Sequence, residues 1–214
     1  MPVDLKKTQL RAIQYWYIDG SFEFSFGGLC LLLGAYFYAQ AAIPETSVSA
    51  LLNVGFIVIV PVGAFLVNRL TGKLKQRITY PRMGYLAYKH PPGGWRRGLR
   101  MGGTLLLAGI TGGIVAALVT HNPKIINWMP GMTAAIFALV LGLLGHRSAL
   151  PRFYFLAILS LLGGLGLSWY HIGDIPGLAV YYIFSGLLLL FSGGLTLWQY
   201  LRHNPIQPEA ADEQ

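Results

Sequence analysis

Hydrophobic residues along this chain fall into six long runs that are separated by polar segments. Each run is close to the roughly 20 residues that a helix needs to cross a bilayer core. None of the runs holds a Lys, Arg or Asp in its middle. They cover about 22–42, 49–68, 101–120, 128–146, 153–171 and 177–200. The pattern predicts an all-α fold, a six-helix transmembrane bundle within a domain at 21–203.

The two ends of the chain have a different pattern. Residues 1–20 are amphipathic and are expected to form an interfacial helix lying in the membrane plane. Asp19-Gly20 is expected to break that helix and lead the chain into the first span. The polar, Pro-containing tail at 204–214 is predicted to be disordered.

Composition supports a membrane location. Only 11% of the 214 residues are charged, whereas soluble domains usually carry about 25%. Cys30 is the one cysteine, which excludes an internal disulfide and a cysteine metal cluster.

The basic residues predict an orientation. If the N-terminus lies inside, 15 of the 16 Lys and Arg residues fall in inner segments, and only Lys124 falls outside. Because Lys and Arg in short loops favour the cytoplasmic side, both termini are expected to be cytoplasmic.

The segment between the second and third spans, 69–100, is basic and rich in Tyr, and it contains no acid. Such a segment suits anionic headgroups on the cytoplasmic side, with its rings in the headgroup layer. A docking surface for a protein partner is the alternative. Nucleic acid is not expected, because no recognised module surrounds the basic residues. The residues predicted to contact lipid or a partner are Lys73, Lys75, Arg77, Tyr80, Arg82, Tyr85, Tyr88, Lys89, Trp95, Arg96, Arg97 and Arg100.

Two acids stand four positions apart at the entrance to the first span. Asp19 and Glu23 lie on the side that carries most of the basic residues, so we expect them to form structural ion pairs with Arg residues of the 69–100 segment. A catalytic carboxylate pair is the alternative.

Small residues recur at four-residue spacing in three spans. Because helices in lipid associate by close packing, such ladders predict helix contacts within the bundle, or homodimerisation as an alternative. The ladders are Gly109, Gly113 and Ala117; Ala134, Ala138 and Gly142; and Ser160, Gly164 and Ser168.

Motifs of known chemistry are missing from the sequence. It has no HExxH, GxSxG, Walker loop or dinucleotide fingerprint. We predict no cofactor, metal or catalytic residue. His121 and His171 could in principle be axial ligands to haem, but both stand at span ends.

Three stretches resemble an uncharacterised family of bacterial multi-pass membrane proteins that carry a basic TYPR-x-GY loop. They are QYWYIDGSFEFSFGG at 14–28, LKQRITYPRMGYLAYK at 74–89 and YLRHNP at 200–205. The resemblance implies a bacterial cytoplasmic membrane and a conserved cytoplasmic loop. It implies no activity.

Three functions fit these observations. The first is a non-catalytic regulatory, sensory or accessory subunit that acts through the basic segment. The second is a transporter or channel for a small neutral or lipid-like molecule. The third is a membrane enzyme that acts on a lipid headgroup. An enzymatic role is less favoured than a non-catalytic one.

Overall fold

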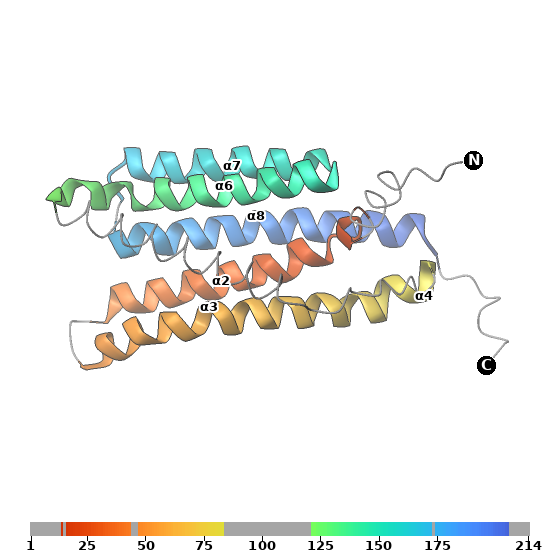
Figure 1. Cartoon of the computed structure of the whole chain (residues 1–214), viewed down its shortest axis with the longest axis horizontal. Helices are drawn as coiled ribbons and strands as arrows, with labels where there is room; N and C mark the ends of the chain where they lie inside the picture. The colour runs from red at the N-terminus through yellow and green to blue at the C-terminus, as the bar shows by residue number, and fades with distance from the viewer. Residues whose placement is uncertain (1–13, 15, 44–46, 84–120, 173, 206–214) are drawn as a thin grey trace, which may run out of the picture.

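The computed structural model describes residues 14, 16–43, 47–83, 121–172 and 174–205, and all regular structure in these ranges is helical. The long helices lie side by side along one axis (Figure 1). They are α2 (Ser21–Ala42), α3 (Ser47–Leu74), α6 (Met129–Ser148), α7 (Pro151–Trp169) and α8 (Asp174–His203). The all-α prediction is therefore confirmed for the described part of the chain.

Four described helices are long and apolar enough to cross a membrane. They are Ser21–Ala42, Lys124–Ser148, Pro151–Trp169 and Asp174–His203. These match the first, fourth, fifth and sixth predicted spans and fit a transmembrane protein. The second predicted span lies within α3, and the third, at 101–120, lies outside the described residues. The count of six spans stays a prediction.

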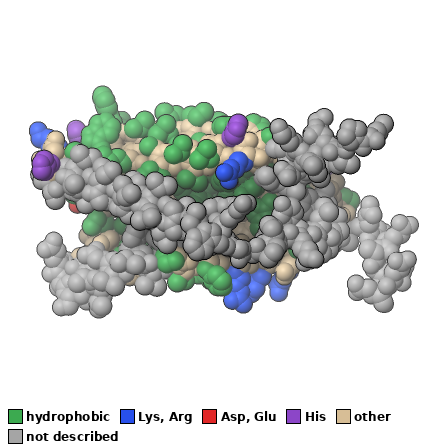
Figure 2. Space-filling model, in the orientation of Figure 1, with side chains coloured by type: hydrophobic (Ala, Val, Ile, Leu, Met, Phe, Trp, Pro, Cys, Tyr) green, Lys and Arg blue, Asp and Glu red, His purple; other side chains and the backbone are tan. Residues whose placement is uncertain are grey.

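The outer surface of the bundle is apolar. Figure 2 shows hydrophobic side chains spread over α6 and α7. Leu139 is 64% exposed and Phe155 is 63% exposed. Large apolar surfaces of this kind are rare on soluble monomers, so lipid is the solvent that this face suits.

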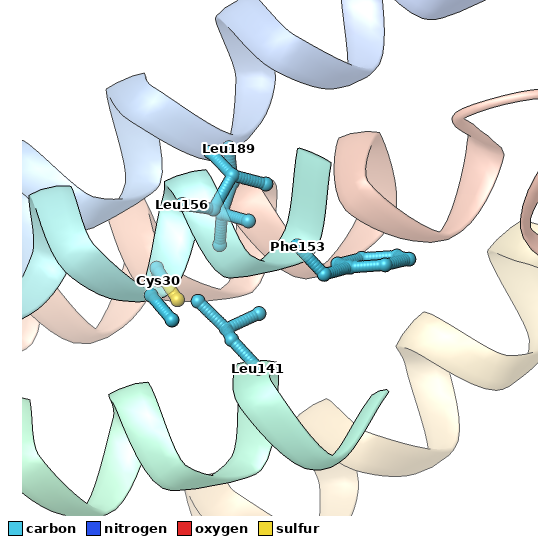
Figure 3. Packing of buried hydrophobic residues seen from close by; sticks show 6 residues of the cluster. Cys30, Leu141, Phe153, Leu156 and Leu189 are labelled. Carbon is cyan, nitrogen blue, oxygen red and sulfur yellow. The ribbon is translucent and has the colours of Figure 1, made fainter. Parts of the chain in front are cut away.

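The core draws on four helices. Figure 3 shows Cys30 of α2, Leu141 of α6, Phe153 and Leu156 of α7, and Leu189 of α8 packed together. All five side chains are buried. The aromatic rings of Phe22, Phe26 and Phe137 stack beside this cluster and extend the packing from α2 to α6.

Helices α2 and α8 pack antiparallel along a seam of small residues. A Cβ atom built on Gly20, Gly27 or Gly34 would lie 2.6, 2.9 or 3.2 Å from the carbonyl oxygen of Gly193, Gly186 or Ala179, in that order. Both sets recur every seven positions, which keeps them on one face of each helix. Any larger side chain would separate the two backbones, so these positions determine how closely α2 approaches α8.

The start of α2 depends on a glycine. Gly20 precedes the helix with φ of 72°, a left-handed conformation that a side chain disfavours. The predicted break at Asp19-Gly20 is present here. Of the predicted N-terminal interfacial helix, residues 14, 16 and 17 are helical, 18–20 form the turn before α2, and 1–13 and 15 lie outside the described residues.

The helix of the second span is longer than its apolar run. Whereas the sequence places a loop from residue 69, α3 continues to Leu74 and is extended by a π-helical turn, η1 (Lys75–Thr79), and by α4 (Tyr80–Met83). A 3₁₀ turn, η2 (Pro123–Trp128), leads into α6. The extension of α3 brings polar residues beside the start of α2.

Candidate functional site

A buried carboxylate joins the start of α2 to the end of α3. Asp19 Oδ2 accepts hydrogen bonds from Lys75 Nζ at 2.9 Å and from Thr79 Oγ1 at 2.7 Å. Asp19 Oδ1 accepts a third from the backbone N–H of Ser21 at 3.2 Å. The side chains of Asp19 and Lys75 are 0% and 1% exposed. An ion pair so deeply removed from water is stable only when its remaining hydrogen-bonding capacity is satisfied, as it is at Asp19.

The π-helical turn explains how two donors reach one oxygen. Lys75 and Thr79 begin and end η1. Because a π-helical turn bonds residues five apart, it is wider than an α-helical turn, and single π turns are frequent at functional sites. Lys75 Nζ also lies 5.0 Å from the centre of the Trp16 ring. The ammonium group is therefore held between a carboxylate and an aromatic face.

A second ion pair lies one turn further along α2. Arg152 Nε lies 2.8 Å from Glu23 Oε1, with Glu23 fully buried and the Arg152 side chain 23% exposed. Arg152 Nη2 also donates to the backbone carbonyl of Tyr17. Arg152 stands in the first turn of α7, so this pair ties α7 to α2 and to the segment before it.

The surroundings of these pairs are positively charged. Burial raises the pKa of the Tyr17 phenol above 10.0, and the charge of Arg147 opposes that rise. Arg147 lies in the last turn of α6. The basic ends of α3 and α6 and the start of α7 therefore surround residues 17–23.

We call Asp19, Glu23, Lys75, Thr79 and Arg152 the ionic junction. In the structure each acid has a cation partner: Asp19 pairs with Lys75 of the 69–100 segment, and Glu23 pairs with Arg152 outside it. Chemically, the junction is suited to holding three segments in fixed positions. A free general base would need a carboxylate that is not already engaged by a buried cation.

The residues predicted to contact lipid or a partner have different environments. Lys73 and Arg77 are exposed, whereas Lys75 is buried against Asp19 and is withdrawn from any such contact. Tyr80 is half-buried, and Arg82 is half-buried with its Nη1 donating to the carbonyl of Ile78 at 2.9 Å. The other members lie outside the described residues: Tyr85, Tyr88, Lys89, Trp95, Arg96, Arg97 and Arg100.

Four of the ladder residues lie at helix contacts. Ala134 is fully buried, and a Cβ on Gly164 would contact it and lie 2.7 Å from the carbonyl oxygen of Pro130. Ser168 Oγ accepts from the Gly131 N–H at 2.9 Å. Ser160 Oγ lies 2.7 Å from the Tyr181 hydroxyl of α8.

The remaining ladder residues divide into three cases. Ala138 packs half-buried against the core cluster. Gly142 differs from the expectation, because no described atom lies within 4 Å of a Cβ built there. Gly109, Gly113 and Ala117 lie outside the described residues.

The histidines considered as haem ligands are exposed. His121 stands just before η2, and His171 follows α7 with φ of 55°. Within the described ranges, no group of three His, Cys, Asp or Glu side chains is placed to hold a metal ion.

Reasoning from sequence missed two features of this region. One is the role of Arg152, which stands far from Glu23 in sequence. The other is the α2–α8 seam, for which the seven-residue recurrence of small residues in both helices was an available signal.

Comparison with protein-family models, curated proteins and solved structures gives no match.

Proposed function

We propose that this chain is a non-catalytic integral membrane protein, a regulatory, sensory or accessory subunit that acts through the basic segment 69–100. The observation that carries the proposal is the set of hydrogen bonds on Asp19 Oδ2, which attach the described start of that segment to the transmembrane bundle. A partner or lipid that shifts the segment would act directly on the start of α2.

The ionic junction supports this role because it is continuous. Lys75 and Thr79 hold Asp19, and four residues later Glu23 meets Arg152 of α7. Buried networks of charged and polar side chains have few arrangements in which every charge has a partner. A displacement of η1 would therefore change the ion pairs that hold α2 and α7. We expect the π turn to be the element that rearranges.

The proposed membrane arrangement has six spans, with both termini in the cytoplasm. Helix α3 with α4 ends at the end of the bundle opposite to the one where η2 begins (Figure 1). The proposed span at 101–120 would connect these two ends. The orientation itself rests on the 15 basic residues that this arrangement places inside.

A transporter for a lipid-like molecule is the second candidate. It is favoured by an apolar groove between α2 and α3 that includes Leu29, Leu32 and Leu66. An enzyme acting on a lipid headgroup has less support, because Asp19 and Glu23 line neither this groove nor the smaller one beside Trp16.

Site-specific photo-crosslinking in native membranes tests the proposal. A crosslinking amino acid replaces Gln76, which is exposed in η1, and a control replaces Tyr170, which is exposed after α7. We expect one protein to be captured at stoichiometric yield from position 76 and not from position 170, and to be lost with Arg77→Gln. Equal capture at both positions would contradict the proposal. Movement of lipid by the purified protein in proteoliposomes would favour the second candidate.

A further inference from the structure

A groove runs between α2 and α3, and no residue of the ionic junction lines it. Its volume is about 480 Å³, within the usual range for small-molecule sites. Along most of its length the lining is apolar, with Leu32 from α2 and Leu66 and Leu70 from α3. Leu32 is 63% exposed and Leu66 is 51% exposed, so the groove opens toward the surroundings of the bundle.

Glycines make the groove possible. Gly28 and Gly63 both line it. No described atom lies within 4 Å of a Cβ built on Gly28, whereas a Cβ on Gly63 would contact the Leu29 side chain. Gly28 therefore borders open space, and a side chain introduced there would occupy the groove.

The basic end of the groove carries two cations. Arg69 and Lys73 line it and stand one helical turn apart on α3, so they share a face. Both side chains are exposed. Within the described residues neither joins an ion pair or a hydrogen bond, in contrast to Lys75, which Asp19 neutralises. The two acids at the entrance to the first span, Asp19 and Glu23, are already engaged by Lys75 and Arg152.

We infer that this groove binds an anionic glycerophospholipid, with one acyl chain between α2 and α3 and its phosphate on Arg69 and Lys73. An acyl chain matches the apolar lining, and a phosphate supplies a counter-charge that no described residue gives to Arg69 or Lys73. The inference rests on the proposed function, since it names the class of lipid that the start of the basic segment recognises. Binding would place the headgroup within one turn of η1 and thus beside the ionic junction.

The test uses the full-length protein, purified in mild detergent and exchanged into nanodiscs that contain dioleoyl phosphatidylglycerol and dioleoyl phosphatidylcholine in equal amounts. Native mass spectrometry then counts each retained lipid. We expect the wild type to retain phosphatidylglycerol preferentially. The Arg69→Gln/Lys73→Gln double variant is expected to lose that preference by about tenfold or more, because each basic residue near a lipid surface contributes roughly 1 kcal/mol. Excess inorganic phosphate should not displace the lipid.

Two variants serve as matched controls. Gly28→Leu should lower retention of both lipids, whereas Gly142→Leu, at a glycine equally open among the described residues but on α6, should not. Arg202→Gln removes a basic residue in the last turn of α8, away from the groove, and should leave the preference unchanged. The inference is overturned if the wild type retains both lipids equally, or if the Arg69/Lys73 double variant keeps its preference. If the wild type prefers phosphatidylglycerol but no protein is crosslinked from position 76, the result counts against the proposed function and not against lipid binding in the groove.

Discussion

Asp19 and Lys75 are 56 positions apart in the chain, and their side chains meet at 2.9 Å in a site that excludes water. One stands at the turn before α2 and the other opens the π turn after α3. Their pairing fixes the register between the entrance of the first span and the start of the basic segment. The hydrogen bond from Thr79 to Asp19 depends on the same register.

Removing one charge of this pair should destabilise the protein more than removing both. Asp19→Asn leaves a buried ammonium group without a counter-charge, and Lys75→Met leaves a buried carboxylate, so each should cost about 3–5 kcal/mol. The Asp19→Asn/Lys75→Met double variant is neutral and should recover much of that loss. Thermal unfolding in detergent, followed by tryptophan fluorescence, measures all three. Simple additivity of the two single effects would show that the charges are not coupled.

The hydroxyl of Thr79 should contribute separately to the stability of the junction. Thr79→Val keeps the shape of the side chain but removes the donor to Asp19 Oδ2. A hydrogen bond to a charged group typically contributes about 1.5–3 kcal/mol. The Thr79→Val variant should therefore unfold at a lower temperature than the wild type. Thr79→Ser retains the hydroxyl and is the control. Equal stability of the Val and Ser variants would rule out the bond as a contributor.

Adjacent glycines in α2 should respond differently to the same substitution. Gly27→Leu forces a side chain against the Gly186 carbonyl and the Leu190 backbone in the α2–α8 seam. Overpacking of this kind costs about 1–3 kcal/mol or more. Gly28→Leu points into the groove and should leave the folded yield in detergent nearly unchanged. Size-exclusion profiles of the two variants provide the comparison, and similar loss of monodisperse protein in both would contradict the seam.

Both termini should be on the cytoplasmic side. A reporter active only in the cytoplasm, fused after residue 214, should be active, and one fused at His121 after a truncation should not. The reason is the placement of basic residues, which anchors inner segments during insertion. A control that replaces Lys124 with Gln should leave the result unchanged. An inactive reporter at the C-terminus, in a fusion protein that is produced and inserted in the membrane, would refute the arrangement.

Several elements could be predicted from the sequence because they depend on local properties. The apolar runs at 22–42, 128–146, 153–171 and 177–200 are long enough to span a membrane, and the structure has a helix at each. Gly20 ends the preceding segment because its backbone adopts a conformation that side chains disfavour. The end of α3 was placed too early, because the apolar run stops near residue 68 while the helix is continued by residues whose polar groups are satisfied from α2.

The sequence by itself determined that the described part of this chain forms long apolar helices, and that Asp19 and Glu23 need cation partners. Only the tertiary structure decided which cations these are, since Lys75 and Arg152 reach them from η1 and α7. It also decided that α8 packs against α2, through small residues that stand 145 to 173 positions apart in the chain. The physical reason is that composition and periodicity act within one helix, whereas charge pairing and backbone contact depend on how separate helices are placed beside one another.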